Sequence, residues 1–147
     1  MPLLVTTFFV AMITLLGALY IPQQEARRTI AVANVGATSL LAYRQAVIDY
    51  LSVNPTFTGT VANAALTFPW GYVPDLRWTN LVSNGTLFVY SVAPNTSLMI
   101  ETLYRMTARS FMLGRNVAGT LVSQNGFSTG IAVPVAIPNG AFVFVGK

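Results

Sequence analysis

The sequence predicts an α+β protein in which a long N-terminal helix packs on an antiparallel β-sheet, with a second, shorter helix. The first observation is an apolar run at the N-terminus, which continues beyond a proline into a segment with helical spacing. The second is an Asn-Gly pair between two strand-like segments, and the third is a series of turn clusters near the C-terminus. Together they predict a helical first third followed by a sheet.

Residues 3–21 (LLVTTFFVAMITLLGALYI) are almost entirely apolar, and the first charged side chain is Glu25. As a helix this run would be about 28 Å long, close to the thickness of the hydrocarbon layer of a bilayer. It predicts a membrane-spanning anchor over residues 1–22, followed by a single domain over residues 23–147. The anchor residues would be Leu3, Leu4, Val5, Phe8, Phe9, Val10, Ile13, Leu15, Leu16, Leu19 and Ile21.

Two alternatives to an anchor stay open, a cleaved secretory signal and a buried core helix. A secretory signal normally begins with basic residues and ends in small residues at the cleavage site. No Lys or Arg precedes this run. The best candidate cleavage site, Leu16-Gly17-Ala18, has a bulky residue where a small one is preferred. The anchor is therefore the favoured interpretation.

The segment after the anchor predicts the second half of the long helix. Pro22 should end or kink the first half, because its ring clashes with the carbonyl four residues earlier. From Gln23 onward apolar residues recur at mostly helical spacing until Asn54-Pro55 stops the pattern. This half is amphipathic, so its apolar face needs a partner.

The partner predicted for that face is a sheet. Trp78–Val82 and Thr86–Val92 are strand-like and flank Ser83-Asn84-Gly85. Asn-Gly is a strong hairpin signal, because a type I′ turn needs positive φ at both central residues. Both faces of the second strand are apolar, which predicts a central strand covered on both sides.

A second helix and three more strands are expected after this hairpin. The helix should span Ser97–Leu113, with Gly114 as its C-cap. Strands are predicted at 118–123, 128–136 and 141–145, separated by turn clusters. Pro134 and Pro138 favour an edge strand or a bend for the middle one, because proline cannot donate to a ladder.

The segment from Phe57 to Leu76 mixes aromatic residues and prolines, which is typical of an ordered loop. It contains Phe68-Pro69-Trp70-Gly71-Tyr72. One interpretation is that Trp70 and Tyr72 pack under the helix. The other is that they form an exposed aromatic surface for a partner.

The residue inventory argues against an enzyme. Only 8% of residues are charged, the net charge is +4, and the chain has no His and no Cys. Gly126-Phe127-Ser128-Thr129-Gly130 matches the G-x-S-x-G pattern of hydrolases, but without a histidine it is better explained as a turn between strands. The four acids show no paired arrangement, so we predict no catalytic residue, no metal site, no cofactor and no small-molecule substrate.

Charge also constrains the partners. The basic residues are spread along the chain, whereas nucleic-acid binding usually shows a clustered basic face, so no nucleic-acid partner is expected. A chain with few charged residues associates readily with other protein molecules, because little charge repulsion keeps them apart. This favours a chain that is part of an oligomeric assembly.

This order of elements resembles type IV pilins, although the basic leader, the Gly-Phe junction and the early glutamate of a prepilin are absent. A closer resemblance is to the PilM family of plasmid-encoded type IVB thin-pilus proteins. It is carried by Tyr43-Arg44-Gln45-Ala46-Val47 before Asn54-Pro55, Pro69-Trp70-Gly71, Trp78-Thr79-Asn80 before Asn84-Gly85, Val133-Pro134 and Ile137-Pro138-Asn139-Gly140, and it covers nearly the whole chain.

The resemblance implies a pilin-like fold and a role in building or anchoring a conjugative pilus at the bacterial inner membrane, with the folded domain in the periplasm. It carries over no catalytic residue. Arg27 and Arg28 oppose this orientation, because positive charge beside an anchor tends to stay in the cytoplasm.

Three functional hypotheses follow. The first is a non-enzymatic, single-pass component of a pilus or secretion assembly, which binds other subunits through its α+β domain. The second is a secreted structural subunit, such as a minor pilin or a fibre-like or capsid-like protein, that loses its N-terminal segment. The third, an enzyme, would need acids that only the fold brings together.

Overall fold

The computed structural model describes residues 2–73, 75–91, 93 and 95–146, without the side chains of residues 2–4 and 16–22. The elements are helix α1 (Pro2–Val53), a short 3-10 turn (Asn63–Ala65), strands β1 (Trp78–Ser83) and β2 (Thr86–Ser91), helix α2 (Ser97–Met106), and strands β3 (Leu113–Val117), β4 (Thr120–Ser123), β5 (Ser128–Ala132) and β6 (Phe142–Val145). This arrangement confirms the predicted α+β class.

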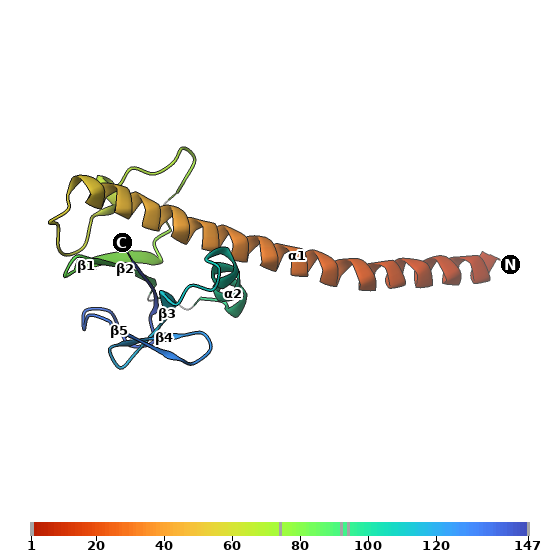
Figure 1. Ribbon diagram of the computed structural model, residues 1–147. Coiled ribbons are helices and arrows are strands. Elements are labelled where there is room, and N and C mark those ends of the chain that lie inside the picture. Colours follow the sequence, from red (N-terminus) through yellow and green to blue (C-terminus); the bar gives the residue numbers. More distant parts are fainter. Residues whose placement is uncertain (1, 74, 92, 94, 147) are drawn as a thin grey trace.

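The six strands form one antiparallel sheet in the order β1-β2-β6-β3-β4-β5 (Figure 1). One face carries Leu87, Leu113 and Phe144, which pack with the buried side chains of both helices in the larger core. The opposite face carries Phe88 and Val143, which pack with residues of the segment 133–141 in a smaller core. The helices and that segment therefore sandwich the sheet.

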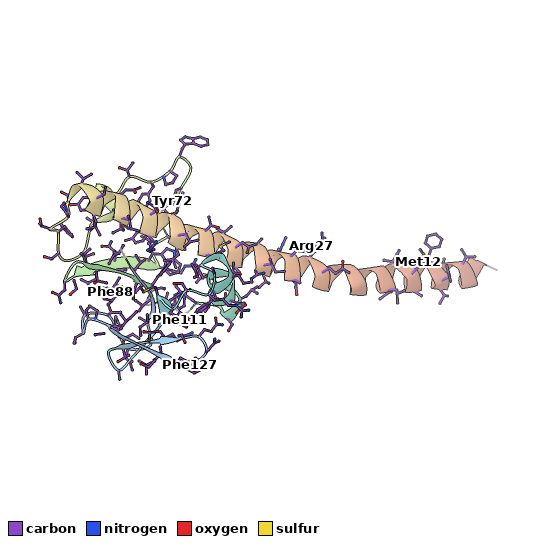
Figure 2. All side chains as sticks on the ribbon, in the orientation of Figure 1. Met12, Arg27, Tyr72, Phe88, Phe111 and Phe127 are labelled. Atoms are coloured by element: carbon purple, nitrogen blue, oxygen red, sulfur yellow. The ribbon has the colours of Figure 1, made fainter. Side chains whose placement is uncertain are left out.

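Helix α1 packs on the domain only through its C-terminal part. Residues 33–51 bury Ala33, Ala37, Leu40, Val47 and Leu51, which recur at helical spacing and face the larger core. The N-terminal half extends beyond the sheet and beyond α2, and Met12 and Arg27 lie on this projecting part (Figures 1 and 2).

The contact of α1 with α2 explains Gly36, which as a glycine disfavours a helix interior. A Cβ atom on Gly36 would lie 2.6 Å from the sulfur of Met99 in α2. The missing side chain therefore lets the two helices approach closely.

The long N-terminal helix is confirmed, and of the two outcomes predicted at Pro22, an end or a kink, the end is wrong. Helix α1 continues from Pro2 to Val53 as one element. Proline lacks one donor and clashes with the preceding turn, but a long helix can absorb such a residue by bending rather than ending. The predicted boundary between an anchor and a domain thus falls inside one helix.

The prediction of a single-pass inner-membrane protein is wrong as well. Across the part of the chain that the structure describes, no helix combines the length and the apolar character that a membrane span requires. The predicted anchor residues with described side chains, Val5, Phe8, Phe9, Val10, Ile13 and Leu15, are all exposed. Leu3, Leu4, Leu16, Leu19 and Ile21 lie outside the described side chains.

The β1–β2 hairpin has the predicted turn. Asn84 and Gly85 have φ values of 50° and 74°, as the two central residues of a type I′ turn require. Strand β2 lies between β1 and β6, with Leu87 and Val89 in the larger core and Phe88 in the smaller one. The predicted central strand covered on both faces is confirmed.

Helix α2 begins at the predicted residue, but it is shorter than expected. The side chain of Thr96 caps it by accepting a hydrogen bond from the Met99 N–H at 3.3 Å. It ends at Met106, because Ala108 and Arg109 adopt left-handed conformations with φ of 51° and 57°. The sequence carries no glycine here, so this ending was not visible in advance.

Gly114, predicted as the C-cap of this helix, instead lies in strand β3. A Cβ atom at Gly114 would come within 2.2 Å of the Val122 carbonyl oxygen, so the glycine permits close approach of β3 to β4. Ala118 and Gly119, with φ of 50° and 81°, turn β3 into β4. Strand β3 itself was not predicted.

Strand β5 is an edge strand, as the two prolines indicated, although it ends at Ala132 and not at residue 136. The chain then leaves the sheet in a turn in which Ile137 N–H donates to the Pro134 carbonyl at 2.9 Å. Ile137 and Val133 cover the smaller core. Strand β6 then inserts between β2 and β3.

Candidate protein-contact surface

The segment 66–77 forms a loop beside α1, and we name it the Trp70 loop. Figure 1 draws it on one side of α1, with strands β1 and β2 on the other side. Its stability decides whether its aromatic residues act as a fixed surface.

A buried polar network fixes the chain just before the loop. The Asn80 side-chain amide in β1 donates to the Tyr43 hydroxyl at 2.8 Å and to the Val61 carbonyl at 2.9 Å. Its oxygen accepts from the Val61 N–H at 2.7 Å, and the Tyr43 hydroxyl donates to Asn63 at 3.1 Å. Burial raises the pKa of Tyr43, so this hydroxyl stays protonated. The network ties α1, β1 and the segment before the loop together.

Stacked aromatic rings hold the middle of the loop on α1. The Phe68 ring lies between those of Tyr43 and Tyr72, with centroid distances of 6.1 Å and 4.7 Å. The Tyr72 hydroxyl donates to the Ser39 carbonyl at 3.2 Å and lies 3.2 Å from the Ser39 hydroxyl. Figure 2 shows Tyr72 beside α1. Tyr72 therefore fastens the loop to the helix.

Trp70 occupies the tip of a tight turn. The Tyr72 N–H donates to the Pro69 carbonyl at 3.0 Å, and Gly71 has a φ of 79°. This is the pattern of a type II turn, which needs positive φ at its third position and places Trp70 at the second. The Trp70 side chain is fully exposed.

An ion pair closes the C-terminal end of the loop. The Arg77 Nε donates to both carboxylate oxygens of Asp75, at 3.0 Å and 2.9 Å, and the Arg77 N–H donates to the same carboxylate at 3.0 Å. Hydrogen bonding to Arg77 lowers the pKa of Asp75, and Asp75 in turn raises the pKa of Arg77. Asp75 thus acts as a turn residue that is held by a cation.

A groove of about 530 Å³ separates the Trp70 loop from α1. Its helix side is lined by Asn34, Val35, Thr38, Ser39 and Ala42, and its loop side by Gly71, Tyr72, Val73 and Asp75. Two side chains of the loop, Val73 and Leu76, are 81% and 90% exposed. The groove is mainly apolar, and the loop beside it exposes Trp70, Val73 and Leu76, which is apolar area of the kind that protein-contact sites use.

The two aromatic residues predicted as partner contacts therefore have different places. Tyr72 packs on the helix, as one interpretation expected, whereas Trp70 is exposed, as the other expected. Sequence reasoning missed Val35, Val73 and Leu76 as exposed apolar neighbours. Val73 and Leu76 closely follow Pro69-Trp70-Gly71, which was a signal, whereas Val35 lies on α1 far from this motif in the sequence. Nothing in the sequence showed which side of the loop would face solvent.

The surface offers shape and apolar area but little reactive chemistry. Asp75 is its one acid, and its carboxylate is engaged by Arg77. Within the described residues, no group of three or more acids lies close enough to hold a metal ion. Ser128, the serine of the G-x-S-x-G pattern, is an exposed residue at the start of edge strand β5, after the turn at Gly126.

A long helix that carries a small α+β domain with a fixed, exposed aromatic loop defines a class of protein suited to contacts with other proteins. The chain belongs to the PilM family, whose sequence model matches residues 8–145. Membership of this family suggests a role in pilus biogenesis.

The chain is also similar to two crystal structures of PilM proteins. The one from Escherichia coli B7A is 23% identical, with a TM-score of 0.60 over 78% of this chain and 91% of that chain, and it supports the fold. The one from Pseudomonas aeruginosa 2192 is 28% identical, with a TM-score of 0.47 over 78% of this chain and 95% of that chain. No curated protein matches this chain.

Proposed function

We propose that this chain is a non-catalytic component of the assembly that builds a type IVB conjugative pilus. In this proposal the α+β domain binds other subunits of the assembly through the Trp70 loop and the adjoining groove. The proposal rests on membership of the PilM family and on the geometry of this surface.

The full exposure of Trp70 on a rigid turn is the observation that carries the proposal. Tryptophan is enriched among the residues that contribute most to binding at protein interfaces, because it buries a large area with few rotatable bonds. Leaving an apolar indole exposed to water costs free energy. The hydrogen bonds of Tyr72 to Ser39 and of Arg77 to Asp75 nevertheless hold the loop in the conformation that exposes Trp70. Since the loop is already ordered, a partner would not have to pay for its ordering on binding.

The absence of catalysis is part of the proposal. Asp49 and Glu101 lie on different helices, Asp75 is paired with Arg77, and Glu25 lies on the projecting part of α1. Catalysis by a pair of carboxylates needs two such groups at one substrate. The chain has no His or Cys to take that role.

Photocrosslinking in cells that assemble the pilus tests this proposal. A benzophenone amino acid would replace Trp70 in the full chain, and irradiation would trap whatever lies against the tip of the loop. We expect discrete crosslinked products that contain other pilus-assembly proteins, identified by mass spectrometry.

The matched control places the same photoreactive residue at Val135, which is also fully exposed but lies in the segment between β5 and β6. The proposal predicts products at position 70 that do not form at position 135. Identical patterns at the two positions, or no product at position 70, would show that the loop is not the docking surface.

A further inference from the structure

A second surface lies on another part of the domain, along α2 and the β3–β4 hairpin. Two adjoining hollows of about 320 Å³ and 210 Å³ share Tyr104, Ser123 and Gln124 in their walls. Figure 2 shows Phe111 and Phe127 on this side of the domain, away from Tyr72. We name the two hollows together the α2 groove.

The frame of the α2 groove is fixed by hydrogen bonds. The Tyr104 hydroxyl donates to the Leu113 carbonyl and accepts from the Gln124 N–H at 2.8 Å, so this ring ties α2 to both β3 and β4. Burial raises the pKa of Tyr104, which keeps the hydroxyl protonated. The groove is therefore formed before any ligand arrives.

The smaller hollow of the groove is mainly apolar. Ile100 of α2, Val122 of β4 and Phe142 of β6 line it, whereas the larger hollow is mainly polar and has Phe111, which is largely exposed, in its wall. The side chains of the smaller hollow favour an apolar group of a ligand there.

An arginine stands in the wall of each hollow. Arg109 belongs to the larger hollow and Arg115 to the smaller one. In the described part of the chain the one ion pair is Asp75–Arg77, so neither guanidinium has a carboxylate partner there. The one acid of the groove, Glu101, lies 3.5 Å from the Gln124 amide.

The strained end of α2 sets the position of one arginine. Ala108 and Arg109 are consecutive non-glycine residues with positive φ, a conformation that costs free energy unless the surroundings impose it. The Arg109 N–H donates to the Tyr104 carbonyl at 2.6 Å. This bond holds Arg109 beside the groove residue Tyr104.

We propose that the α2 groove binds an acidic segment of a partner protein. One apolar side chain of that segment lies against Val122 and Phe142 in the smaller hollow, and carboxylates of the segment pair with Arg115 there and with Arg109 in the larger hollow. Guanidinium groups bind carboxylates through two parallel hydrogen bonds, and both arginines lack such a partner within the described chain. The apolar lining of the smaller hollow favours a peptide over a nucleic acid, which would need a continuous basic face.

Binding of a synthetic peptide tests this inference independently of the Trp70 loop. The probe is a fluorescein-labelled decapeptide in which Asp and Glu alternate with Leu and Phe, titrated with the full chain and followed by fluorescence anisotropy. A second peptide carries Asn and Gln in place of the acids. We expect the acidic peptide to bind at least about tenfold more tightly than the neutral one, and more weakly as salt rises.

The decisive variant is Arg109→Gln with Arg115→Gln, and the matched control is Arg27→Gln with Arg28→Gln on the projecting part of α1. Both pairs remove the same charge. We expect about a tenfold or greater loss of affinity in the groove variant and less than about a twofold change in the control. If the groove variant fails to fold, Arg115→Gln alone, at an exposed strand position, keeps the test valid.

Amide chemical shifts locate the peptide on the protein. The acidic peptide should perturb Gly114, Val122 and Gln124 and leave Trp70 and Val73 unchanged. Equal losses in the two charge variants, perturbation centred on the Trp70 loop, no binding at millimolar peptide, or equal competition by single-stranded DNA would each overturn the inference.

Discussion

The two sides of helix α1 within the domain differ in how they are covered. On the sheet side Leu40 and Val47 are completely buried in the larger core, whereas on the loop side Val35 and Thr38 are exposed along an open groove. The sheet side is packed as a protein interior is, and the loop side is only fastened at a few points. The difference indicates that one side of α1 stabilises the fold and the other presents a binding surface.

Truncating a side chain on the sheet side of α1 should cause the largest loss of folding stability. Leu40→Ala leaves a cavity under α1 and should lower the free energy of unfolding by about 3 kcal/mol, measured by denaturant titration. Leu15→Ala is the matched control, because Leu15 is 66% exposed on the projecting part of the same helix. Its change should stay below about 0.5 kcal/mol. Similar losses in the two variants would remove the distinction between packed and unpacked parts of α1.

Removing side chains from the polar network of Asn80 and Tyr43 should cause the next largest loss of folding stability. Asn80→Ala leaves the Val61 N–H and carbonyl buried without their partner, which should cost about 2 kcal/mol of stability. Tyr43→Phe removes one hydroxyl and keeps the ring, so it should cost about 1 kcal/mol. Thermal unfolding of both variants checks the order, and a reversed order would mean that the hydroxyl and not the amide holds the network.

The Trp70 loop itself should contribute little to global stability. Tyr72→Phe removes the hydrogen bonds to Ser39 and should lower the free energy of unfolding by about 0.5 to 1 kcal/mol, with faster amide hydrogen exchange in the loop. Trp70→Ala should change stability by less than about 0.5 kcal/mol, since the indole is fully exposed. A large loss for Trp70→Ala would mean that the indole packs against the domain.

The ion pair of the loop should give the free energy of unfolding a weak dependence on pH. The pKa of Asp75 is lower in the folded chain than in the unfolded chain, so its contribution is present above the unfolded value near 3.9 and is lost as pH falls through the folded value. The contribution should be less than about 1 kcal/mol, because Asp75 and Arg77 are partly exposed. Asp75→Asn should therefore be less stable than the natural chain at pH 6, and the difference should shrink as the pH falls below the unfolded value near 3.9.

Local patterns predicted the framework of this fold. The apolar spacing after Gln23 predicted an amphipathic helix, in which Leu40, Val47 and Leu51 are buried but Ile30 and Val35 are exposed. Asn84-Gly85 located the β1–β2 hairpin. The prolines after β5 located the edge of the sheet. Each of these signals depends on residues that are neighbours in the sequence, so no knowledge of distant contacts was needed.

The failures concern features that distant contacts decide. Helix α2 ends where Ala108 and Arg109 take left-handed conformations, which only the packing of Tyr104 on β3 and β4 makes favourable. A glycine after a helix is typical of a C-cap, but Gly114 instead allows β3 to lie close to Val122 of β4. The apolar N-terminal run resembled a membrane span in composition, and the described residues do not support one.

The candidate surface was predicted only in part for the same reason. The sequence singled out Trp70 and Tyr72 but gave both the same two alternatives. Trp70 is exposed and Tyr72 is packed because of a type II turn at Gly71 and a hydrogen bond from Tyr72 to Ser39, about 30 residues away along the chain. The hydrogen bond to Ser39 leaves no mark in the local sequence pattern, although Gly71 is a local signal for the turn.

The most direct test of the central claim is the number of pili that cells assemble when Trp70→Ala replaces the wild-type chain at the same protein level. We predict at least about a tenfold loss of pili, because truncating an interface tryptophan typically costs 2 kcal/mol or more of binding free energy. Tyr72→Phe, which keeps the indole in place, should retain most pili. Wild-type numbers of pili with Trp70→Ala would contradict the assignment of the Trp70 loop as the docking surface.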